Sequence, residues 1–80
     1  MRIDVFLKKT LIINQREMAK GLCARGFVKI NGSTAKPAKE LKEGDIIEIE
    51  TFDGIEKYKV LQVPAGNVKK DEVELYVTRQ

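Results

Sequence analysis

The 80-residue chain has no histidine, one cysteine and two prolines, and these shortages narrow its possible functions. Without histidine, Cys23 has no imidazole to activate it, and no Cys/His cluster has the spacing of a metal site. A lone cysteine also excludes an internal disulfide framework and is typical of a reducing compartment, so we expect a cytoplasmic protein. No glycine-rich phosphate loop is present. The sequence therefore predicts no catalytic residue, metal or cofactor, and a protein that is not an enzyme.

Long apolar runs are also missing. No stretch approaches the roughly 18 apolar residues of a membrane span. The N-terminal MRIDVFLKK lacks the apolar segment and cleavage site of a signal peptide. We expect no contact with a membrane and no small-molecule substrate. Eighty residues predict one domain with a small core.

Positive charge, by contrast, is concentrated in one half of the chain. Residues 1–42 contain ten Lys/Arg and three acids, whereas residues 43–80 contain five Lys/Arg and nine acids, for a net charge of +3. This polarity predicts a basic face that binds a polyanion, although unevenly charged solvated surface would give the same count. The other functional alternative is a protein-interaction or regulatory module that uses the acidic stretch from Glu43 to Glu56.

Apolar spacing in the first 24 residues predicts two short helices. The first has a stripe formed by Ile3, Phe6, Leu7 and Leu11. Asp4 is expected to complement the dipole of this helix. The second is predicted to begin at an Asn14 cap, with Glu17 reaching back to it, and to bury Met18, Ala19, Leu22 and Cys23. Gly21 lies mid-helix, where a close helix–helix contact would explain it.

A hairpin is predicted directly after the second helix. Gly26 suits the left-handed residue beyond a helix end, with Phe27 folding back onto Leu22. The Asn31-Gly32 dipeptide between two short β-prone runs predicts a two-residue turn. Further strands are expected at 46–50 and 56–63. For residues 67–78, one helical turn followed by a strand and a longer helix are both open.

Basic and amide side chains along the second helix and the hairpin are candidate ligands for a polyanion. Free N–H groups and the dipole at the start of the second helix favour phosphate, close to Gln15, Arg16 and Lys20. Arg2 precedes the first helix and has no dipole role there. In a complex with a nucleic acid, the cations would contact phosphates, and the amides would bond sugar or base edges. The predicted set is Arg2, Asn14, Gln15, Arg16, Lys20, Lys29, Asn31 and Lys36.

The segment from Arg2 to Asp45 resembles the S4 RNA-binding domain. The matching residues are Arg2-Ile3-Asp4 with Phe6-Leu7, Arg16 with Ala19-Lys20, the run from Gly26 to Gly32, Lys36-Pro37 and Leu41 to Asp45. The resemblance implies an α+β fold, with two N-terminal helices packed on a small, strongly bent, mostly antiparallel sheet (the alpha-L RNA-binding motif). It implies one S4-type domain over residues 1–80, with a core motif at 1–45 and a C-terminal strand extension at 46–80.

The whole chain is similar to the small stand-alone members of this family that ride on the large ribosomal subunit. This similarity implies non-catalytic binding of rRNA, tRNA or both, in ribosome-associated quality control of stalled peptidyl-tRNA. The family's RNA-contacting arginines correspond to Arg2 and Arg16, which we expect to lie side by side. A role in ribosome assembly or recycling is an alternative within the same family. The protein is expected to act as a monomer.

Overall fold

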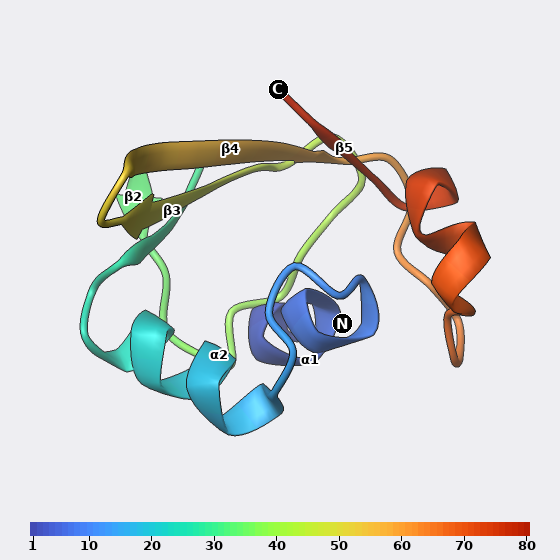
Figure 1. Ribbon diagram of the computed structural model, residues 1–80, viewed down its shortest axis with the longest axis horizontal. Helices are drawn as coiled ribbons and strands as arrows, with labels where there is room; N and C mark the ends of the chain where they lie inside the picture. The colour runs from blue at the N-terminus through green and yellow to red at the C-terminus, as the bar shows by residue number, and fades with distance from the viewer.

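Two helices lie under one face of a five-stranded sheet in the computed structural model, which describes all of residues 1–80 (Figure 1). The helices are α1 (Ile3–Lys9) and α2 (Arg16–Ala24), and a 3-10 helix, η1 (Lys70–Leu75), comes late in the chain. The strands are β1 (Val28–Ile30), β2 (Ser33–Thr34), β3 (Ile46–Thr51), β4 (Gly54–Val60) and β5 (Val77–Arg79). Their order is β2-β1-β3-β4-β5, and every pair is antiparallel. The expected α+β fold is confirmed.

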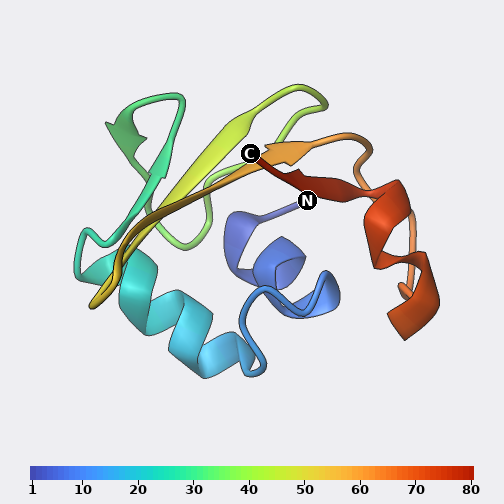
Figure 2. The ribbon, with the colours of Figure 1, turned by 45° about the horizontal axis from the view of Figure 1, so that its top comes forward.

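The core lies between the helices and the concave face of the sheet, which arches over them in Figure 2. Val28 of β1 pairs with Ile49 of β3, and Ile30 pairs with Ile47, so that alternate residues of both strands face inward. The helices bury the apolar side chains Ile3, Phe6, Leu7, Ala19 and Cys23 against this face. None of these helices combines the length and the apolar composition that a membrane span requires.

The end of α2 and the following hairpin form as the sequence predicts. Gly26 has a left-handed backbone (φ +83°), and its N–H and that of Phe27 donate to the carbonyls of Cys23 and Leu22. Asn31 (φ +50°) and Gly32 (φ +86°) then form the two-residue turn between β1 and β2. Both predictions are confirmed.

The link between α1 and α2 differs from the prediction. Leu11 has a left-handed backbone (φ +61°) after α1 ends at Lys9, so it leaves the apolar stripe and is 40% exposed. Ile13 is buried, and its N–H donates to the Leu7 carbonyl. Gln15, which has an extended backbone, and not Asn14, is therefore the N-cap of α2, and no side chain caps the helix.

Further expectations need correction on α2 and in the C-terminal segments. With α2 starting at Arg16, Ala19 and Cys23 are buried and Leu22 is half-buried, but Met18 is 54% exposed. Strand β4 ends at Val60, because beyond it the N–H groups of Leu61 and Gln62 donate to a carbonyl outside β5. Of the two alternatives for residues 67–78, the structure has the short helix followed by a strand, namely η1 and then the start of β5, and not one longer helix.

Gly21 has no packing reason to be glycine, contrary to the expected helix–helix contact, since a Cβ there would meet no atom within 4 Å. We expect Gly21→Ala to raise the free energy of unfolding by up to about 1 kcal/mol, because alanine loses less backbone entropy on forming a helix. Chemical denaturation followed by circular dichroism would measure the change. Gly26→Ala is the matched control and should destabilise, since its φ is positive. If Gly21→Ala were less stable than the unchanged protein, Gly21 would have a packing role after all.

Candidate nucleic-acid interface

Arg2 and Arg16 meet at one buried carboxylate. Asp4, in the first turn of α1, is fully buried, and its Oδ2 atom accepts from Nη2 of Arg2 at 3.0 Å. The same oxygen lies 3.7 Å from Nε of Arg16. The arginine side chains themselves are 39% and 50% exposed. The expectation that Arg2 lies beside Arg16 is confirmed, and Asp4 is the reason.

The backbone around this carboxylate is fully bonded. The other Asp4 oxygen accepts from the N–H of Val5 at 2.8 Å. The N–H groups of Ile3 and Asp4 donate to the carbonyls of Lys39 and Pro37 at 2.8 and 3.3 Å. Because the start of α1 is closed by these bonds, it has no free N–H groups for a ligand. The segment around residues 37–39 thus fixes the position of Asp4 and its arginines.

The charge balance at this site favours an anion. A buried carboxylate is costly unless it is paired and hydrogen-bonded, and Asp4 has both kinds of partner. Two guanidinium groups face one carboxylate, so one positive charge remains uncompensated. The buried Nε of Arg2 has no hydrogen-bond partner. We refer to Asp4, Arg2 and Arg16 together as the arginine site, which combines a fixed geometry with excess positive charge.

The start of α2 adds donors beside the arginine site. The N–H groups of Arg16, Glu17 and Met18 have no acceptor, since the first bonded one is that of Ala19, which donates to Gln15. Lys20 lies one helical turn after Arg16 and therefore on the same side of α2. Asn14, Gln15 and Lys20 are all exposed. Of the predicted ligands, Arg2 and Arg16 belong to the arginine site and Lys20 lies on α2, whereas Gln15 is the N-cap of α2 and Asn14 precedes it.

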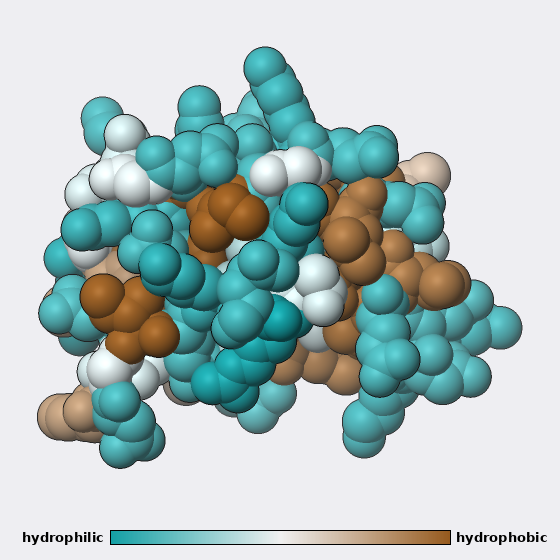
Figure 3. Space-filling view, turned by 90° about the horizontal axis from the view of Figure 1, so that it is seen from above, coloured by the Kyte–Doolittle hydropathy of each residue, from teal (hydrophilic) through white to brown (hydrophobic).

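The structure does not bring Lys29 to this surface. Its neighbours Val28 and Ile30 face the core, so Lys29 lies on the outer face of the sheet, paired with Thr34 on one side and Glu48 on the other. Figure 3 looks onto this face, which is largely hydrophilic with separate apolar patches. Contact between RNA and Lys29 stays a prediction, on a different side of the molecule from the arginine site.

Asn31 has a structural task that the sequence did not reveal. Its Nδ2 atom donates to Asp45 at 3.0 Å, and its Oδ1 atom accepts from the N–H of Ile46 at 3.0 Å. Asp45 in turn accepts from the N–H of Lys42 at 2.8 Å. The Asn31 amide therefore fastens the hairpin turn to the turn before β3. A contact of Asn31 with RNA stays a prediction. It would have to use the second N–H of the amide or the remaining acceptor site of Oδ1.

Sequence reasoning missed Asp4, which it assigned only to the helix dipole. A signal was available, because Asp4 precedes Leu7 by three residues and so shares the inward face of α1. A charged residue at such a position needs a buried partner.

Cys23 is also close to this carboxylate. Burial, and secondarily the negative charge of Asp4, raises the pKa of the Cys23 thiol to about 11. As predicted, Cys23 is a core residue.

The profile of the S4 domain matches residues 1–47, which cover α1, α2, the hairpin and the start of β3. The chain belongs to the S4 domain family. An S4-family relative from Helicobacter pylori strain J99, the RQC P-site tRNA stabilizing factor, is 44% identical over 96% of this chain and 93% of that protein. A solution structure of a hypothetical protein is 42% identical, with a TM-score of 0.87 over 100% of this chain and 96% of that one. Vibrio cholerae heat shock protein 15 shares the fold, with a TM-score of 0.89 over 100% of this chain and 81% of that one at 20% identity.

We expect Asn31→Gly to lower the free energy of unfolding by roughly 1–3 kcal/mol, because two hydrogen bonds of the amide are lost. Glycine tolerates the positive φ at this position, so the change isolates the side chain. Denaturant unfolding would measure the loss. Ser33→Gly, two residues further along the same hairpin, is the control, since the exposed Ser33 hydroxyl makes no hydrogen bond within the protein. Equal stability of Asn31→Gly and the unchanged protein would contradict the structural task.

Proposed function

We propose that this S4 domain protein binds structured RNA on the large ribosomal subunit and stabilises P-site tRNA there, in ribosome-associated quality control of stalled peptidyl-tRNA. The observation that carries the proposal is the arginine site, with two half-exposed guanidinium groups fixed on one buried carboxylate. The name of the Helicobacter relative, a P-site tRNA stabilizing factor, supports the choice of RNA. The protein binds and positions RNA and catalyses no reaction.

The physical basis of binding is contact with phosphates. Guanidinium groups match phosphate oxygens through two parallel N–H bonds, and α2 presents three free backbone N–H groups beside Arg16. Contacts of this kind recognise the shape and charge of helical RNA, which suits rRNA and tRNA. Residues 1–80 act as a single unit and as a monomer in the cytoplasm, with residues 46–80 extending the sheet of the 1–45 core motif. The partners are the ribosome and tRNA.

The alternative of an acidic protein-binding face has less support. Glu48 lies directly opposite Lys29 on one neighbouring strand and opposite Lys57 on the other. Opposite charges at these positions stabilise the sheet and reduce the net negative charge of its outer face.

A role in ribosome assembly or recycling would use the same arginine site. It therefore differs from the proposed role in when the protein binds the ribosome, and not in the chemistry of binding.

Arg16→Gln should weaken binding to large ribosomal subunits carrying P-site tRNA by at least roughly tenfold, because a charged contact to phosphate is lost. Its melting temperature should change little, since a half-exposed pair at 3.7 Å contributes weakly. Affinity should also fall steeply as salt rises, with a slope that is smaller by about 1 in the variant. Equilibrium binding over a KCl series would measure both.

Arg79→Gln is the matched control, because Arg79 is an exposed arginine on β5 and takes no part in an ion pair. It carries the same change of charge and should bind almost as tightly as the unchanged protein. Arg2→Gln should weaken binding as well, but with some loss of stability, since Asp4 would keep only the longer contact to Arg16. Equal affinities of Arg16→Gln and Arg79→Gln would refute the proposal.

A further inference from the structure

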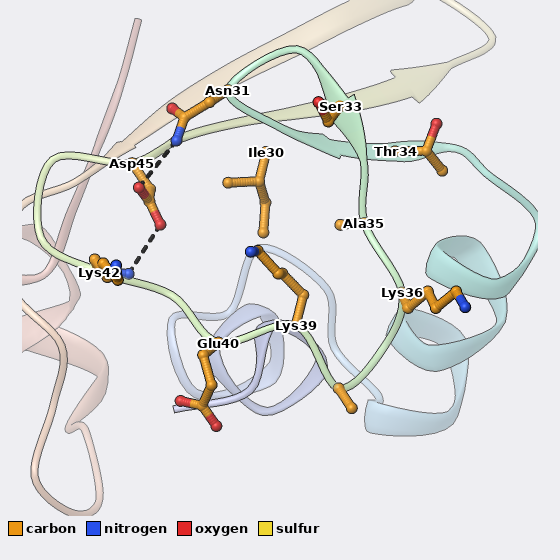
Figure 4. Close-up of a pocket in the computed structure, with 11 residues that line it drawn as sticks. Ile30, Asn31, Ser33, Thr34, Ala35, Lys36, Lys39, Glu40, Lys42 and Asp45 are labelled. Atoms are coloured by element: carbon orange, nitrogen blue, oxygen red, sulfur yellow. Dashed lines mark hydrogen bonds between the residues drawn. The ribbon is translucent and has the colours of Figure 1, made fainter.

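A groove of about 690 Å³ lies between the β1–β2 hairpin and the segment 36–42 (Figure 4). Its floor contains the buried side chains of Ile30 and Ala35. Its walls are the exposed hydroxyl residues of the hairpin on one side and three exposed lysines of the segment on the other, namely Ser33, Thr34, Lys36, Lys39 and Lys42. None of the residues of the arginine site lines this groove.

The acidic residues of the groove are already engaged. Glu40 binds the N-terminal ammonium group at 2.7 Å. Asp45 accepts from the Asn31 amide with one oxygen and from the N–H of Lys42 with the other. None of the three lysines takes part in an ion pair, and the hydroxyls of Ser33 and Thr34 make no hydrogen bond within the protein. The groove therefore has donors and positive charge without partners.

The shape of the groove suits a strand of anions better than a small anion. In Figure 4 the Lys39 ammonium reaches into the hollow toward Ile30, while the Lys36 side chain extends from the same segment and points away from the hollow. All three lysines are exposed and spread along the segment at intervals of three residues. A small ligand is usually enclosed and desolvated, whereas a nucleic-acid backbone is held by separate contacts along an open basic groove.

The groove and the arginine site lie on different sides of one segment. The carbonyls of Pro37 and Lys39 point to the start of α1, where they accept from Ile3 and Asp4. Between residues 36 and 42 the same segment contributes Lys36, Lys39 and Lys42 to the lining of the groove. We infer that this groove is a second RNA-backbone site, in which Lys36, Lys39 and Lys42 bind the phosphates of an RNA strand other than the one bound at the arginine site.

This inference rests on the proposed function and extends it, since a protein with two separate phosphate sites can join two RNA strands. Lys36 is a candidate from the sequence, whereas Lys39 and Lys42 are assigned by the groove. Two strands held by a domain of this size would bring neighbouring RNA elements into one fixed arrangement. The affinity of the protein for the two joined RNA strands then depends on both sites.

The test compares two triple variants with the same change of charge. The groove variant is Lys36→Gln/Lys39→Gln/Lys42→Gln. The control is Lys57→Gln/Lys59→Gln/Lys70→Gln, in which all three lysines are exposed, free of ion pairs and outside the groove. Binding to large ribosomal subunits carrying P-site tRNA is measured over a KCl series at constant Mg²⁺. Melting temperatures verify that both variants are folded.

We expect the groove variant to bind at least roughly tenfold more weakly than the control at low salt. Its plot of log K against log salt should lose about 0.7 to 0.9 of slope for each phosphate contact removed. Equal affinities and slopes of the two triple variants would overturn the inference. A groove variant that loses thermal protection by inorganic phosphate, yet binds subunits like the control, would identify a small-anion site and would also overturn it.

Arg16→Gln on both backgrounds separates this inference from the proposed function. If the two sites contact RNA separately, the fold-losses of Arg16→Gln and of the groove variant should multiply, because sites without a shared binding partner contribute additively to the free energy of binding. If Arg16→Gln weakens binding and the groove variant matches its control, the proposed function stands and the second site is wrong. If the groove variant loses affinity while Arg16→Gln binds like its Arg79→Gln control, the arginine site is wrong and the groove assignment stands.

Discussion

The buried carboxylate of Asp4 is the constraint on which the rest of the structure depends. A charge without solvent exposure must be compensated, and here the compensation comes from Arg2, Arg16 and the N–H of Val5. Arg2 precedes α1 and Arg16 opens α2, so one side chain connects the two helices at their N-terminal ends. The guanidinium groups that compensate this buried carboxylate remain half-exposed. They therefore present positive charge to solvent in a fixed geometry.

The rest of the chain holds this geometry in place. The carbonyls of Pro37 and Lys39 close the first turn of α1, and the N-terminal ammonium binds Glu40 of the same segment. The segment is in turn fastened to the hairpin turn through the bonds that join Lys42, Asp45 and Asn31. Because these groups are ordered before any ligand arrives, binding RNA costs less conformational entropy. Few residues thus build a rigid basic surface.

The sequence predicted turns and helix ends well where they depend only on the conformational preferences of neighbouring residues. The Asn31-Gly32 turn and the end of α2 at Gly26 follow from backbone conformations that these residues adopt easily. The position of Arg2 beside Arg16 came from family resemblance. The contacts of Asp4 could not be derived in full, since they join residues whose spatial arrangement the fold decides. The same holds for Leu11 and Asn14, where the buried Ile13 determines the path of the link. Of the groove lysines, Lys36 was predicted from the sequence, whereas Lys39 and Lys42 gave no signal, because their role depends on which acidic side chains of the groove are already paired.

Asp4→Asn tests the central role of this carboxylate most directly, because the loss of negative charge and the loss of arginine positioning change RNA affinity in opposite directions. The variant keeps the size of the side chain, removes a negative charge beside both arginines and raises the net charge by one. If RNA binding depended only on the net field, affinity for large ribosomal subunits with P-site tRNA would rise. Because Asp4 holds both arginines in place, we predict instead a weaker affinity than that of the unchanged protein, measured at a temperature where melting curves show the variant to be folded. An affinity that is equal or higher would contradict the positioning role of Asp4.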